Sequence, residues 1–90
     1  MSSLYAELTF FIPHAASLKD KRRIVRGIID KTRHKFNASV AEVDTQDILK
    51  TLTIGVAVVS GDVSHTRSML DAIVRFMEEH ADAELSGVKM

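Results

Sequence analysis

The chain has 90 residues, 46% hydrophobic and 27% charged, and its twelve Lys and Arg balance twelve Asp and Glu. This length supports one folded domain over residues 1–90 with a modest core. The absence of cysteine excludes disulfides and thiolate metal sites and is typical of a reducing compartment, so we expect a cytoplasmic location.

The N-terminal segment, residues 4–12, predicts a strand. Apolar residues alternate with others there, which is the period of a strand with one buried face. Pro13 ends the strand because it cannot donate a ladder hydrogen bond. Since Glu7 interrupts the apolar run, the segment is expected to be neither a signal peptide nor a membrane span, and no membrane association is expected.

The next segment predicts an amphipathic helix of about five turns. Ser17 is the expected N-cap, and Asp20 completes a weak capping box. Asn37 is expected to end the helix in the left-handed conformation. At 100° per residue the apolar side chains fall within an arc of roughly 140°: Leu18, Ile24, Val25, Ile28, Ile29, Thr32 and Phe36.

The second half of the chain predicts two further strands, a second helix and room for a short last strand. Residues 38–43 and the uncharged, β-branched residues 51–59 are the strands. Asp62 or Ser64 caps the helix, and "AELSGVKM" at the C-terminus leaves room for the fourth strand. The buried stripe expected on the second helix consists of Val63, Thr66, Met69, Leu70, Ile73, Val74 and Met77.

This order of elements, βαββαβ, predicts an α+β fold of the ferredoxin-like plait. Such a fold has one four-stranded antiparallel sheet with two helices on one face. The strands at 4–12 and 51–59 are expected to be central and parallel to each other, with right-handed crossovers. The fold alone decides little about activity.

Three stretches, "IPHAASLKDKR", "RHKFNASVAEV" and "TIGVAVVS", resemble the YlxP-like bacterial proteins, a family catalogued as a domain of unknown function. The resemblance implies a ferredoxin-like fold and, through the usual gene setting of the family, a connection with RNA or the ribosome. It implies no catalytic residue. His14 stands where the family is expected to have Gly, and Leu49 and Thr51 stand where Trp and Arg are usual.

Basic residues are concentrated in the first helix. Residues 19–35 hold eight of the twelve Lys and Arg but only two acids, for a net charge of +6, which leaves −6 on the other 73 residues. With Leu18 as zero, most of the cations form one flank between roughly 40° and 160° around the helix. Such a charge run is most simply explained as a solvated face, and a binding surface is the alternative.

The position of these cations along the helix favours the binding surface. Cations in the last turns complement the helix dipole, but those in the first turns oppose it by about 0.3–1 kcal/mol each. Cations beside a helix N-terminus attract phosphate. Lys21 projects near the apolar arc and is alternatively expected to snorkel or to pair with Glu42 or Asp44. The predicted nucleic-acid-binding residues are Lys19, Lys21, Arg22, Arg23, Arg26 and Arg33.

The sheet face away from the helices is predicted to be small, mildly apolar and uncharged. It lacks the aromatic residues on both central strands with which RNA-recognition motifs stack bases, so any RNA is expected on the helix flank. Such a face favours cover by another subunit, giving a homo-oligomer, at least a homodimer. The predicted oligomer interface consists of Tyr5, Thr9, Phe11, Thr53, Ala57 and Val59.

No catalytic residue, metal site or cofactor is predicted. The four histidines lie on different elements without metal-ligand spacing. Ser17 has no predicted His/Asp pair to activate it, and the segment before the first helix lacks the glycine-rich phosphate loop of acylphosphatases, which share this fold. Two hypotheses remain: a non-catalytic RNA- or ribosome-associated module acting through the basic helix, and a structural or protein-interaction module that homo-oligomerises through the open sheet.

Overall fold

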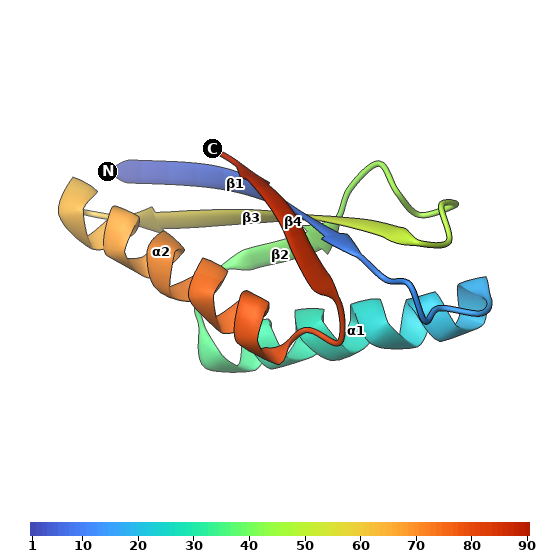
Figure 1. Cartoon of the computed structure of the whole chain (residues 1–90). Helices are drawn as coiled ribbons and strands as arrows, with labels where there is room; N and C mark the ends of the chain where they lie inside the picture. The colour runs from blue at the N-terminus through green and yellow to red at the C-terminus, as the bar shows by residue number, and fades with distance from the viewer.

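A computed structural model describes residues 1–90 and confirms the predicted order of elements (Figure 1). Both helices lie on the same face of one four-stranded sheet, as expected for a ferredoxin-like α+β plait. Neither helix is apolar enough over its length to cross a membrane. The elements are β1 (Ser2–Phe11), α1 (Leu18–Lys35), β2 (Ser39–Glu42), β3 (Thr51–Ser60), α2 (Val63–His80) and β4 (Glu84–Lys89).

The strands lie in the order β2-β3-β1-β4, and every neighbouring pair is antiparallel. The prediction that β1 and β3 are central is therefore confirmed, but the prediction that they are parallel is wrong. The reason is the connection at residues 43–50, which joins β2 and β3 as antiparallel neighbours. Since the α1 crossover makes β2 parallel to β1, β3 lies between them and runs opposite to both.

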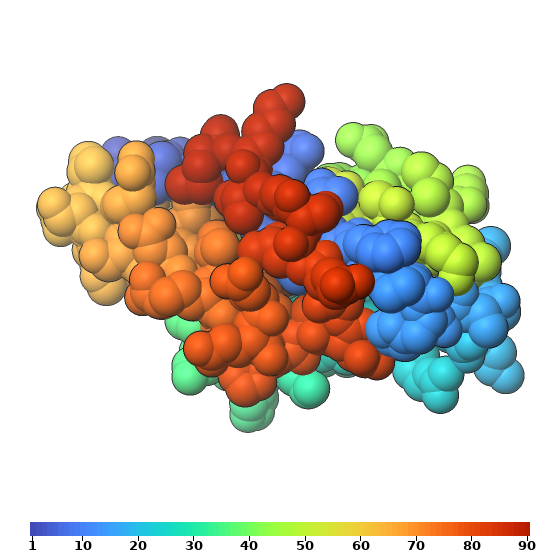
Figure 2. Space-filling model, in the orientation of Figure 1, coloured from blue at the N-terminus to red at the C-terminus, as the bar shows by residue number.

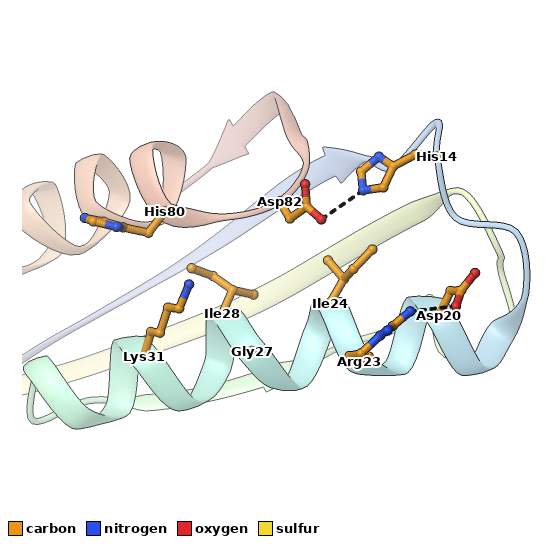
Figure 3. A pocket seen from close by; sticks show the side chains of 9 residues that line it. All are labelled: His14, Asp20, Arg23, Ile24, Gly27, Ile28, Lys31, His80 and Asp82. Carbon is orange, nitrogen blue, oxygen red and sulfur yellow. Dashed lines mark hydrogen bonds and ion pairs between the residues drawn. The ribbon is translucent and has the colours of Figure 1, made fainter.

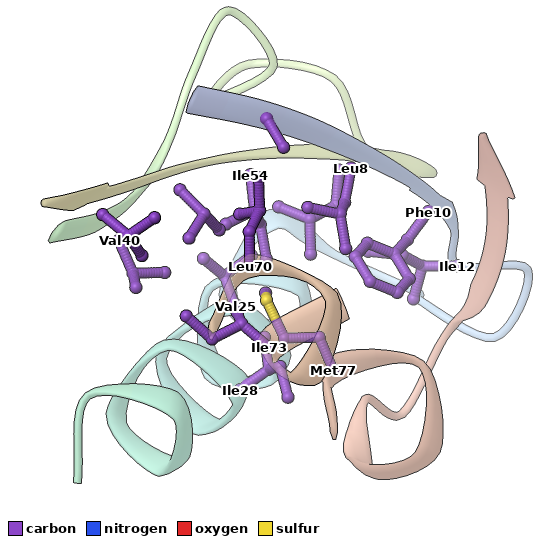
Figure 4. Packing of buried hydrophobic residues seen from close by; sticks show 14 of the residues in the cluster. Leu8, Phe10, Ile12, Val25, Ile28, Val40, Ile54, Leu70, Ile73 and Met77 are labelled. Atoms are coloured by element: carbon purple, nitrogen blue, oxygen red, sulfur yellow. The ribbon is translucent and has the colours of Figure 1, made fainter. Parts of the chain in front are cut away.

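The core lies between the sheet and the two helices (Figure 4). Alternate residues of β1 from Ala6 to Phe10 are fully buried, as is Ile12 just after the strand, which confirms the period-two pattern. Ile28 of α1 and Leu70 of α2 pack from the helical layer. Leu18 and Val63 were predicted to be buried but are 37% and 69% exposed, because each is the first residue of its helix.

The helix ends are capped largely as the sequence indicated. Ser17 Oγ accepts from the Asp20 N–H (3.1 Å), and Asp20 Oδ2 accepts from the N–H of Ala16 (3.3 Å). Asp62, rather than Ser64, is the N-cap of α2. The predicted left-handed Asn37 is wrong: α1 ends on extended Phe36 (φ −124°) and leads directly into β2. Asp44, in the β2–β3 connection, is instead the non-glycine residue with positive φ (63°).

Candidate nucleic-acid interface

Four exposed cations gather on the first turns of α1, and we call them the basic row: Lys19, Arg22, Arg23 and Arg26. Together with Asp20 they line a shallow surface hollow of about 550 Å³. Asp20 Oδ1 pairs with Arg23 Nη2 at 2.7 Å. The other three cations have no acidic partner within 4.0 Å. The row therefore presents positive charge that folding does not neutralise.

Lys21, also predicted to bind nucleic acid, does not belong to this surface. Its side chain is 1% exposed, and its Nζ lies 2.9 Å from Glu42 Oε2. The same ammonium donates to the carbonyl oxygens of Thr45 and Ile48. Its position beside the apolar arc brings it under the β2–β3 connection, where phosphate cannot reach it. Of the two expectations for Lys21, the structure supports pairing with Glu42.

Arg33 lies apart from the basic row, near β2. Its Nη2 donates to the Val40 carbonyl oxygen at 2.6 Å. Since β2 is an edge strand, this bond satisfies an acceptor on the free edge of the sheet. Asp30 and Glu42 line the surface between Arg33 and Arg22. Arg33 therefore has a structural role that the helical periodicity did not indicate, and this predicted nucleic-acid-binding residue lies outside the basic row.

A groove that the sequence did not predict runs beside α1, and we call it the α1 groove (Figure 3). It has a volume of about 460 Å³. His14 Nε2 and Asp82 Oδ2, 3.1 Å apart, join the segments after β1 and after α2, which lie against each other in Figure 2. The lining residues are His14, Asp20, Arg23, Ile24, Gly27, Ile28, Lys31, His80 and Asp82.

Gly27 lies in the middle of α1 without a packing reason. A Cβ built there meets no atom within 4 Å. We therefore expect Gly27→Ala to raise the free energy of unfolding by about 0.5–1 kcal/mol, because glycine is a poor helix former. Denaturant unfolding measures this. The control is Gly55→Ala in β3, whose Cβ would lie 2.6 Å from Tyr5 Oη and should not stabilise. A loss of stability in Gly27→Ala would contradict the prediction.

The predicted oligomer interface lies on the open face of the sheet, where Tyr5, Phe11 and Val59 are 47%, 45% and 59% exposed. The hydroxyls of Thr9 and Thr53 lie 3.2 Å apart across the central strands, and Ala57 is opposite Tyr5. The prediction that this face is uncharged is wrong. Glu7 of β1 lies directly opposite Lys89, which the short last strand β4 adds to this face.

The pKa of Tyr5 reports on the surroundings of its side chain on this face. Desolvation raises the pKa of the phenol above its ordinary value of 10.0, as do the hydrogen bond from Oη to Glu7 (3.0 Å), the charge of Glu7 and the charge of Asp44. A raised pKa means that the folded state holds the proton more tightly than the unfolded chain. This contribution to stability is complete below about pH 10 and is lost as the pH rises through the folded-state pKa.

Glu7→Gln should therefore lower the apparent pKa of Tyr5. Tyr5 is the single tyrosine and the chain has no tryptophan, so the absorbance of the phenolate follows this one group. Asp71→Asn, which removes an exposed acid on α2, is the control and should leave the titration unchanged. An unchanged titration in Glu7→Gln would show that the contact with Glu7 is not formed in solution.

The histidines and acids form no metal centre in the structure, since no three of these side chains lie close enough together. His14 pairs with Asp82, and His80 stacks on Phe76 with ring centroids 4.3 Å apart. Ser17, the one hydroxyl considered as a nucleophile, has its Oγ occupied as the α1 N-cap.

The fold and the surface together define a small ferredoxin-like protein with an exposed basic helix. The sequence comparisons then identify the family. Residues 4–90 match the family described as "Protein of unknown function (DUF503)". The chain is 31% identical over 80 residues to "Uncharacterized protein YlxP" of Bacillus subtilis (strain 168), covering 89% of this chain and 87% of that protein. The chain belongs to this family, which confirms the resemblance seen in the sequence.

Proposed function

We propose that this protein is a non-catalytic RNA- or ribosome-associated binding module whose basic row binds phosphates. The observation that carries the proposal is the set of exposed cations on the first turns of α1, three of which have no acidic partner. Folding alone favours acids at a helix N-terminus. A phosphate partner explains why cations stand there instead.

The geometry suits phosphate in two further respects. Successive turns of a helix are about 5.4 Å apart, so Lys19, Arg22 and Arg26 form a line of charge rather than a point. The backbone N–H groups of Leu18 and Lys19, in the first turn, are not used by the Ser17 cap, which binds the N–H of Asp20. Contacts of this kind fix position and orientation on RNA without reading base identity.

The absence of catalysis is part of the proposal. Asp20, the half-buried acid beside the basic row, is occupied by Arg23 and by the Ala16 N–H. A general base or nucleophile needs a partner that orients it towards a substrate. The lack of such a partner beside the row supports a binding role for these cations rather than a catalytic one.

A salt titration of the unmodified protein tests the proposal. Three phosphate contacts predict a slope of about −2.7 in log K against log salt, so affinity for a structured RNA should fall about 40-fold between 50 and 200 mM salt. Fluorescence polarisation with a labelled RNA hairpin measures both values. A protein with no affinity for the hairpin at low salt would overturn the proposal.

A structural or protein-interaction module that homo-oligomerises through the open sheet face is the second candidate. Tyr5, Phe11 and Val59 favour it, because three large exposed apolar side chains share this one face. We expect light scattering at micromolar concentration to give at least the mass of a dimer. Val59→Glu should then give the monomer mass. A monomer mass for the unmodified protein would contradict this second proposal and leave the first intact.

A further inference from the structure

The α1 groove carries an inference that rests on the proposed function and deepens it. We propose that the groove holds one nucleotide of a single-stranded RNA segment, next to the structured RNA bound by the basic row. Arg23 belongs to both surfaces, since it lines the hollow of the basic row and the α1 groove. A strand leaving the row at Arg23 therefore enters the groove directly.

The groove offers charge at both ends of a bare stretch of helix. Arg23, Gly27 and Lys31 are successive positions four residues apart, about one turn each, so they follow one line along α1. Lys31 is exposed and has no acidic partner within 4.0 Å. Of the two acids of the groove, Asp20 pairs with one nitrogen of Arg23, and Asp82 lies 3.1 Å from His14 Nε2, which balances its charge only when the imidazole is protonated. A strand laid here presents phosphates to Arg23 and to Lys31.

Gly27 favours a ligand in the α1 groove independently of the charges. A glycine inside a helix weakens it, and no neighbouring atom of this protein requires the missing side chain. The missing side chain leaves the backbone of α1 accessible to a ligand between Arg23 and Lys31. Ile24 and Ile28 lie on either side of Gly27 in Figure 3. A sugar or base can therefore approach the helix backbone at Gly27 closely, which a bulky side chain at this position would prevent.

The size of the groove selects a single strand. At about 460 Å³ it is within the range of sites for small ligands, about 300–1,000 Å³, and too small for a duplex. His14 and Asp82 also close part of its rim. Unpaired nucleotides can be splayed out of a stack and laid into such a site, and sequence-tolerant contacts to them are usual.

Two probes test the inference: a blunt RNA hairpin and the same hairpin with a short single-stranded extension. The unmodified protein should bind the extended hairpin about tenfold more tightly, which is the order of gain expected from one charge-assisted contact to a phosphate. Gly27→Leu, which places a bulky side chain in the groove, and Lys31→Gln, which removes one charge, should each abolish most of that gain. Both should bind the blunt hairpin as the unmodified protein does.

Arg75→Gln is the matched control, because it removes one exposed cation from α2, outside the groove. It should keep the tenfold gain. Thermal unfolding of each variant checks that the fold is intact. Equal affinity of the unmodified protein for the two probes would overturn the groove inference and leave the proposed function standing. Failure to bind either probe would overturn the proposed function and the inference with it.

Discussion

Lys21→Met should lower the free energy of unfolding by about 3–5 kcal/mol, the usual cost of removing one partner from a buried ion pair. Methionine keeps the packed stem but removes the ammonium. The Glu42 carboxylate, 13% exposed, then loses its counter-charge, and the carbonyl oxygens of Thr45 and Ile48 lose a donor. For a domain of this size the melting temperature should fall by at least about 12 °C.

Lys50→Met is the matched control for that experiment. The Lys50 ammonium also donates to two backbone carbonyl oxygens, those of Pro13 and Ala15, but it is exposed and has no carboxylate partner. Its loss leaves no buried charge unpaired and should cost about 1.5–3 kcal/mol, less than the loss of Lys21. Adding Glu42→Gln to Lys21→Met should recover part of the stability, because the unpaired charge is gone. Equal losses in Lys21→Met and Lys50→Met would contradict a special role for the buried pair.

The double variant Lys19→Glu/Arg22→Glu should weaken binding to the RNA hairpin about 100-fold or more. Two charge-assisted contacts of roughly 1.5–3 kcal/mol each are lost, and each 1.4 kcal/mol is tenfold. The salt slope should also become shallower by about two units. Stability should be unchanged or slightly higher, because an acid at position 19 suits the helix dipole and stands four residues before Arg23.

That opposite movement of affinity and stability separates a binding surface from a solvated face. The control Arg67→Glu/Arg75→Glu makes the same change in net charge on exposed positions of α2. It should keep most of the affinity, since only the overall field changes. If both double variants weaken binding equally, general charge rather than the basic row holds the RNA. Unchanged binding in Lys19→Glu/Arg22→Glu would remove the row from the site.

The regular elements were predictable because burial on one face leaves a periodic trace in the sequence. Alternation from Ala6 to Ile12 located β1, and Ser17 with Asp20 located the start of α1. Strand direction left no such trace. Residues 43–50 have no period, so nothing local indicated that this connection makes β3 antiparallel to β1, or that Asp44 rather than Asn37 takes the positive φ.

The candidate site was predictable in charge but not in contacts. The helical angle brought the cations of the basic row together, and it placed Lys21 near the apolar arc. It could not show that Arg33 reaches the free edge of β2, because that contact depends on how the strand lies beside the helix. The α1 groove was missed for the same reason: His14 and Asp82 are far apart in sequence and meet only in the fold.

The contacts of Lys21 also bear on how the molecule opens locally. A connection such as residues 43–50 is ordinarily among the first segments to exchange its amide hydrogens or to be cut by proteases. Here the Thr45 and Ile48 carbonyls are bound to a lysine on the second turn of α1. Opening residues 43–50 therefore removes two hydrogen-bond acceptors from the buried Lys21 ammonium. We expect this connection and the first turns of α1 to open together, as one cooperative unit. The helix turns that carry the basic row are thus held against a rigid support rather than a fluctuating loop.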